Sequence, residues 1–149
     1  FPKEIFQFKN LNKLTLSKNK IEVIPNSISM LPYLQEIDFS ENKIERFPDA
    51  ICTLKHLTSL NINQNYLENI PICIENLQKL KRLDLSGNCS AEFPSELGNL
   101  DNLEWVDFRV ILMNDRTQEI IMDLLPNAKV YLSNPCACNI KGFPDPFDE

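Results

Sequence analysis

Trp105, the only tryptophan of the chain, lies in a segment whose residues are suited to bind another molecule. Trp105, Asp107 and Arg109 are spaced two residues apart, so an extended strand would turn all three side chains to the same face. Tryptophan, tyrosine and arginine dominate measured interface hot spots, because large rigid groups lose little entropy on binding. We therefore predict a partner-binding site around these three residues. The predicted site as a whole consists of Trp105, Asp107, Arg109, Arg82, Asp84, Tyr131, Asp38 and Asn61.

Trp105 also has a purely structural interpretation, in which residues of the C-terminal segment cover its indole ring. The substitution Trp105→Ala distinguishes the two interpretations, because only a binding residue would affect the partner and leave the fold intact. A large loss of stability with partner binding unchanged would contradict the binding interpretation.

Acidic and amide side chains recur every 23 residues, at Asp38, Asn61, Asp84 and Asp107. Neighbouring strands lie about 4.8 Å apart, so Asp84 and Asp107 would lie close together in a sheet. Paired carboxylates can transfer protons or hold a hard cation. The favoured interpretation is a solvated acidic stripe, whose charge is offset by nearby lysine and arginine side chains.

The five cysteines include one metal-like motif, Cys136-x-Cys138. Structural zinc sites normally use a second pair of ligands, and the sequence contains no second pair of this kind. A disulfide within the motif or a reduced pair is therefore favoured over zinc. The other cysteines, Cys52, Cys73 and Cys89, are expected to be buried as small apolar residues. We predict no metal and no cofactor, and the presence of a single histidine argues against most hydrolase triads.

An internal repeat in the sequence predicts the secondary-structure elements that position these residues. Leucines recur every 23 residues, at Leu11, Leu34, Leu57, Leu80 and Leu103. Each begins the pattern L-x-x-L-x-L-x-x-N, in which Ile, Val or Phe can replace the later leucines. Apolar residues two apart, such as Leu14 and Leu16, indicate a short strand with one buried face. One such strand cannot bury its face alone, so successive strands must stack into a parallel sheet.

Asparagine and proline complete each unit of the repeat. The asparagines follow the predicted strands at Asn19, Asn42, Asn65 and Asn88. A buried amide at a turn offers two donors and an acceptor to unpaired backbone groups, so we expect these residues to stack as a ladder. An Ile-Pro or Phe-Pro step comes next, at Pro25, Pro48, Pro71 and Pro94. Proline lacks an N–H and has a fixed φ, which suits the start of a short helical turn.

These motifs resemble the leucine-rich repeat family, and the resemblance covers nearly the whole chain. The 23-residue unit with its Ile-Pro step is similar to repeats of small bacterial leucine-rich repeat proteins and of eukaryotic Ras-pathway scaffolds. The resemblance implies an α/β fold, a right-handed solenoid with a concave parallel β-sheet and short helical or 3-10 turns on the convex side. It also implies a non-catalytic module that binds a protein or peptide on the concave face.

The repeats are expected to form one domain over residues 1–149. Residues 1–10 match the second half of a unit, so we expect a truncated or partly disordered N-terminus. After the last unit, residues 117–125 have the apolar spacing of a helix, and either Asp115 or Thr117 is the expected N-cap. A last strand is expected within 125–132, one residue early in the period. Residues 134–149, the end of the 115–149 terminal region, are expected to form a cap over that strand.

Charge and composition narrow the range of partners. Fifteen Lys and Arg against 21 Asp and Glu give a net charge of −6, which disfavours nucleic acid. No apolar run approaches the roughly 20 residues that a membrane-spanning helix needs. The expected function is protein binding, in a bacterial surface or secreted protein that adheres to or interacts with a host. Its odd number of cysteines fits a reducing cytoplasm equally well.

Two other functions are open at this point. The chain could be the substrate-recognition arm of a longer enzyme or signalling scaffold. It could also be a surface protein that binds a metal or a saccharide, although one tryptophan disfavours a sugar-binding groove. The sequence predicts neither an oligomeric state nor a particular partner.

Overall fold

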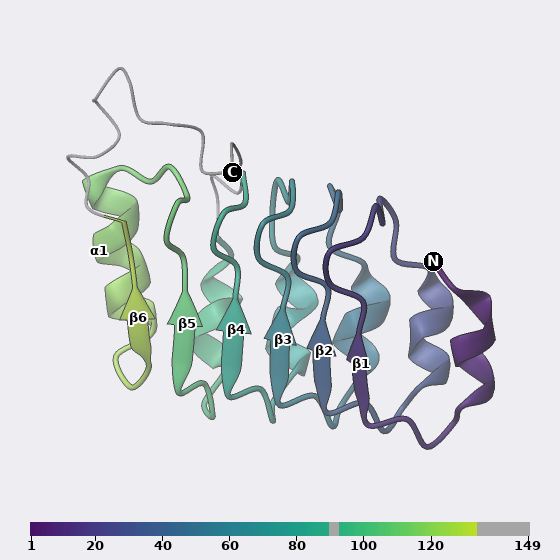
Figure 1. The fold of residues 1–149 in the computed structure, drawn as a ribbon. Helices are drawn as coiled ribbons and strands as arrows, with labels where there is room; N and C mark the ends of the chain where they lie inside the picture. The colour runs from purple at the N-terminus through teal and green to yellow at the C-terminus, as the bar shows by residue number, and fades with distance from the viewer. Residues whose placement is uncertain (90–92, 134–149) are drawn as a thin grey trace.

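Six short strands form one parallel sheet in the computed structural model, which describes residues 1–89 and 93–133 (Figure 1). The strands follow one another across the sheet in chain order, and each pairs with its neighbour along its whole length. The predicted α/β solenoid with a parallel sheet is therefore confirmed. The strands are β1 (Lys13–Thr15), β2 (Glu36–Asp38), β3 (Ser59–Asn61), β4 (Arg82–Asp84), β5 (Trp105–Asp107) and β6 (Lys129–Tyr131).

Short 3-10 helices, one before β1 and one between each pair of strands from β1 to β5, lie together on one side of the sheet (Figure 1). They are η1 (Lys3–Gln7), η2 (Asn26–Met30), η3 (Asp49–Thr53), η4 (Ile72–Asn76) and η5 (Ser95–Asn99). A proline in extended conformation is the N-cap of each one, which confirms the predicted role of the Pro step. We call this side the convex face and the opposite side of the sheet the concave face.

Apolar side chains fill the space between the sheet and the helical turns as one continuous core. Leu57, Leu60 and Ile62 represent a complete unit, with exposed fractions of 0%, 1% and 0%. Burying a side chain of this size contributes about 1.5–3 kcal/mol. Because each unit packs against the next, this core holds neighbouring strands in register and fixes which residues point to the concave face.

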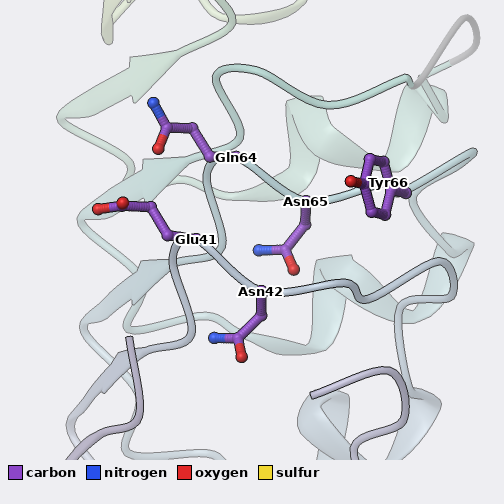
Figure 2. A pocket seen from close by; sticks show the side chains of 5 residues that line it. All are labelled: Glu41, Asn42, Gln64, Asn65 and Tyr66. Atoms are coloured by element: carbon purple, nitrogen blue, oxygen red, sulfur yellow. The ribbon is translucent and has the colours of Figure 1, made fainter. Parts of the chain in front are cut away.

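The predicted asparagine ladder is present between strand ends and convex turns. Asn65 represents it: its Oδ1 accepts a hydrogen bond from the Ile44 N–H (2.9 Å), and its Nδ2 donates to the carbonyls of Phe39 and Ile62. Figure 2 shows Asn42 and Asn65 in successive turns, beside a depression of about 190 Å³. Asn42, Asn65 and Asn88 are buried as predicted. Asn19 is exposed, because β1 is an edge strand of the described sheet and the amide bonds only to its own turn.

One position of each unit adopts left-handed backbone geometry, which the repeat pattern does not predict. It lies directly before the ladder position, and its φ is 57° at Lys18, 53° at Glu41, 49° at Gln64, 66° at Gly87 and 61° at Val110. This geometry turns the chain out of the strand, and the N–H of the left-handed residue then donates to the next unit. Only glycine adopts it without steric cost.

The last connection contains an α-helix, as predicted. Helix α1 runs from Asp115 to Leu124, and its N-cap is Asn114, whose side chain accepts a hydrogen bond from the Thr117 N–H (2.8 Å). The expectation that Asp115 or Thr117 caps the helix is therefore wrong, because asparagine before the first helical residue already accepts that bond.

The register of the last strand also differs from the prediction. Val130 pairs with Val106 on β5, a separation of 24 residues, so β6 comes one residue late in the period and not one residue early. The longer helical connection explains the shift, since α1 has ten residues where each η helix has five. The expected cap at 134–149, with Cys136 and Cys138, lies outside the described residues.

Two cysteines form a disulfide between adjacent convex turns. Cys52 on η3 is bonded to Cys73 on η4, with their Cα atoms 5.8 Å apart. Cys52 is buried as predicted, but neither residue is a free apolar thiol, because neighbouring units place the two positions side by side. Cys89 is a free thiol and exposed, which contradicts its expected burial.

Candidate protein-binding face

Strands β4, β5 and β6 present two rows of side chains across their concave face. The parallel register places Trp105 between Arg82 and Lys129 in the first row. In the second row it places Asp107 between Asp84 and Tyr131. Residues of three units that are far apart in the sequence thus become neighbours through the strand pairing alone.

The aromatic and cationic side chains of these rows are in contact with one another. The Trp105 and Tyr131 rings have their centroids 5.6 Å apart, and the Arg82 guanidinium carbon lies 4.5 Å from the Trp105 centroid. On the far side, the Lys129 Nζ lies 5.0 Å from the Tyr131 centroid and the Arg109 guanidinium carbon 5.4 Å from it. A cation over an aromatic face is attracted by the ring quadrupole. We call these five residues the Trp105 cluster.

Tyr131 titrates under the influence of this cluster. Hydrogen bonding to Lys129 and the positive charge of that residue lower the pKa of Tyr131 below its ordinary value of 10.0. Trp105 and Arg109 act in the same direction, whereas burial opposes them. The site therefore favours negative charge at the position of the Tyr131 hydroxyl.

Arg109 forms an ion pair with Asp107, whose side chain is buried. The Arg109 Nε donates to the Asp107 Oδ1 (3.1 Å) and its Nη2 to the Oδ2 (2.6 Å), a bidentate arrangement. The Asp107 side chain is 2% exposed, whereas the Arg109 side chain is 58% exposed. Hydrogen bonding to Asp107 raises the pKa of Arg109 above its ordinary value. Asp107 thus anchors the guanidinium from below and is itself out of reach of a partner.

The other members of the acidic column close the turns after their own strands. The Asp84 Oδ1 accepts hydrogen bonds from the Ser86 N–H (3.1 Å) and Oγ–H (2.7 Å). Asp38 bonds Ser40 in the same way, and the Asn61 Oδ1 accepts from the Asn63 N–H. All three are partly buried. The expectation of a solvated acidic stripe is therefore wrong for Asp107, which is buried, whereas the other three keep part of their surface exposed. Short polar side chains at this position satisfy local backbone donors.

The concave face over β1–β3 has paired charges and no aromatic side chain in its strand rows. The Lys13 Nζ lies 2.7 Å from a Glu36 carboxylate oxygen, and hydrogen bonding to Glu36 raises the pKa of Lys13. Both side chains are more than half exposed, so the pair contributes little to stability. Asp38 and Asn61 line a shallow depression of about 220 Å³ beside this pair. They lie on different strands from the Trp105 cluster and do not join it.

The structure thus brings together most of the predicted site. Trp105, Arg82, Tyr131 and Arg109 lie in the Trp105 cluster, and Asp107 and Asp84 lie next to it on the same strands. Lys129 was not predicted as a site residue. The register of β6 places Lys129 opposite Trp105. A last strand that begins one residue early, as the sequence predicts, would not place it there.

Residues 2–131 match the family description "Leucine-rich repeat region". The chain belongs to the leucine-rich repeat family. Among curated protein sequences, none matches the chain.

Solved structures of other leucine-rich repeat proteins have the same fold. A leucine-rich repeat protein of Leptospira interrogans is 37% identical with a TM-score of 0.84, over 87% of this chain and 33% of that one. A plant peptide hormone receptor, RGFR1 in complex with RGF2, is 31% identical with a TM-score of 0.70, over 90% of this chain and 22% of that one. An internalin of Listeria monocytogenes has 20% identity and a TM-score of 0.67, with 91% and 46% covered. The chain spans less than half the length of each.

Within residues 1–89 and 93–133, no group of three or more His, Cys, Asp or Glu side chains is placed to hold a metal ion. No helix in the same ranges is both long enough and apolar enough to cross a membrane.

Proposed function

We propose that this leucine-rich repeat chain is a non-catalytic module that binds a protein or peptide partner on its concave face, with the Trp105 cluster at the centre. The observation that carries the proposal is the contact between two aromatic rings and three cationic side chains on neighbouring strands. Rigid aromatic groups beside arginine are the usual composition of an interface hot spot.

The position of the cluster supports the same role. Its side chains lie on the face away from the apolar core, so the units can stack without them. Arg82, Arg109 and Lys129 are exposed, and Trp105 and Tyr131 are partly exposed. Solenoids present wide sheet surfaces for such contacts, and the related plant receptor was solved with RGF2 bound.

We further propose that the protein is secreted or displayed on a bacterial surface, where it adheres to or interacts with a host. The Cys52–Cys73 disulfide supports export, because disulfides persist mainly in oxidising compartments. The similarity to a Leptospira interrogans protein supports a bacterial source. The coverage of 22–46% of the related chains favours an alternative in which this domain is the recognition arm of a longer protein.

The test is capture of partners by the immobilised chain from lysates of host and source cells, with quantitative comparison of variants. Trp105→Ala combined with Arg82→Ala removes exposed parts of the cluster. Arg109 is left in place, because its loss would leave the buried Asp107 carboxylate without a counter-charge. We expect this double variant to lose the captured partner while it retains its thermal unfolding midpoint.

The matched control is Tyr33→Ala combined with Arg46→Ala, which removes an exposed aromatic and an exposed cation from loops between units. The control is expected to capture the same partner as the unmodified chain. Equal capture by the Trp105 variant and the unmodified chain would exclude the concave cluster as the binding site. A lower thermal unfolding midpoint of the Trp105 variant, with capture unchanged, would assign Trp105 to stability alone.

A further inference from the structure

The concave face has an uneven distribution of charge along the solenoid. Over β1 and β2 the Lys13 ammonium is paired with Glu36. Over β4–β6 the acidic residues are turned inward, with Asp107 buried and Asp84 bonded to its own turn. Arg82 and Lys129 form no ion pair with any described residue. The end of the sheet that carries the aromatic rings is therefore also the end with unpaired positive charge.

The strand pairing sets the spacing between the backbones of Arg82 and Lys129. Arg82 and Lys129 occupy the same row and are separated by one strand, so their Cα atoms lie two strand spacings apart, or about 10 Å. A peptide in polyproline II conformation rises about 3.1 Å per residue with three residues per turn. Its side chains at i and i+3 therefore point to the same side about 9 Å apart, which matches the Cα spacing of Arg82 and Lys129.

The ring between the two cations favours the same kind of peptide. Trp105 lies between Arg82 and Lys129 in the row, and Tyr131 lies beside it. Grooves lined by aromatic rings are the usual docking surface for proline-containing segments, because the preformed polyproline II helix loses little entropy on binding. Carboxylates on such a segment would supply the negative charge that Arg82 and Lys129 lack.

We propose that the concave face over β4–β6 binds an acidic, proline-containing segment of a partner protein in polyproline II conformation. Two carboxylates three residues apart pair with Arg82 and Lys129, and the apolar residues between them pack against Trp105. This inference rests on the proposed function and names the chemistry of its partner.

The chain's own sequence provides a probe with this chemistry. Residues 145–148 read Asp-Pro-Phe-Asp and lie outside the described residues. The test uses two synthetic peptides, one with this tetrapeptide and one with Asn-Pro-Phe-Asn, each flanked by glycine and serine and blocked at both ends. Binding is read from the emission of Trp105, the sole tryptophan, and from the anisotropy of a dye on the peptide.

We expect the aspartate peptide to bind and the asparagine peptide to bind about tenfold more weakly, since each exposed ion pair changes affinity by roughly two- to fivefold. Arg82→Gln and Lys129→Gln should each lower the affinity for the aspartate peptide by that two- to fivefold factor and leave the affinity for the asparagine peptide unchanged. Lys20→Gln, at an exposed lysine after β1, is the matched control and should have no effect. Thermal unfolding of each variant verifies that it is folded.

Equal affinity for the two peptides, or no effect of either glutamine variant, would overturn the proposal. Asp145→Asn combined with Asp148→Asn in the full chain tests a different occupant. If the aspartate peptide binds only to that variant, the chain's own C-terminal segment occupies the face and the partner proposal is wrong. Capture that depends on Trp105, with no peptide binding, would retain the proposed function and reject only this partner chemistry.

Discussion

At the scale of single residues, the left-handed position of each unit has the largest mismatch between residue type and backbone. Val110 has a φ of 61°, and its side chain is branched at Cβ, a combination that is a conformational outlier. Gly87 occupies the same position one unit earlier with a φ of 66°. Backbone strain at such positions costs of order 1–3 kcal/mol and is balanced by the surrounding fold.

Val110→Asn is expected to stabilise the chain by about 1 kcal/mol, because asparagine tolerates the left-handed region. Val110 is 56% exposed, so the substitution removes little apolar packing. Gly87→Ala should have the opposite effect, since its φ is positive and an added Cβ would lie 3.2 Å from the Gln64 Cγ. Urea unfolding of both variants provides the measurement. A destabilised Val110→Asn variant would show that the strain at this position is not relieved.

The ladder asparagines allow a second comparison between equivalent residues. Asn65→Ala removes the acceptor of the Ile44 N–H and the donor to two buried carbonyls, so we expect a loss of about 2–4 kcal/mol. Asn19→Ala should cost less than about 1 kcal/mol, because Asn19 is exposed and bonds only within its own turn. Equal losses of unfolding free energy in the two variants, measured by chemical denaturation, would contradict a stabilising role for the hydrogen bonds between units.

At the scale of elements, the repeat predicts the positions of the convex turns but not the disulfide that joins two of them. The Pro steps correctly locate η2 to η5, because proline restricts the backbone wherever it occurs. Cys52 and Cys73 are 21 residues apart, whereas the repeat period is 23, so the repeat pattern does not predict that they are neighbours. Their contact depends on how η3 packs beside η4, which only the three-dimensional structure provides.

The disulfide should contribute measurably to stability. It closes a loop of 21 residues, and the chain-entropy relation gives about 3 kcal/mol for a loop of this length. Cys52→Ala combined with Cys73→Ala is therefore expected to lower the free energy of unfolding by about that amount. Cys89→Ala is the control and should be nearly neutral, because Cys89 is an exposed free thiol.

Thiol counting checks the bridge independently. Of five cysteines, two are in the bridge, so the denatured, non-reduced chain should expose at most three thiols. A count of five in protein purified without reductant would contradict the bridge and remove the support that it gives to export.

At the scale of the whole molecule, the sequence predicts the sheet because each unit repeats the same apolar pattern. The pattern becomes uninformative after Leu103, where Ile111 replaces the ladder asparagine and a helix replaces the Pro step. The register of β6 therefore depends on the length of α1, and so does the identity of Lys129 as a neighbour of Trp105. The rest of the Trp105 cluster was predictable, since strand alternation alone turns Trp105 and Arg109 to the same face.

The charge distribution over the whole concave face leads to a pH dependence. Lys129 lowers the pKa of Tyr131, so Tyr131 ionises below its ordinary value of 10.0 and places a negative charge among the cations. This charge competes with an acidic partner for Lys129. Affinity for the aspartate peptide should therefore be constant at neutral pH and fall as the pH rises through the lowered pKa.

Tyr131→Phe distinguishes this effect from a general loss of positive charge. The variant retains the ring beside Trp105 but cannot ionise, so its affinity for the aspartate peptide should persist to higher pH than that of the unmodified chain. Linkage requires the reciprocal effect, in which the bound peptide raises the pKa of Tyr131 because two negative charges then share one site. Spectrophotometric titration of tyrosinate with and without peptide measures this shift. Parallel loss of affinity in both proteins would place the titrating group elsewhere on the sheet.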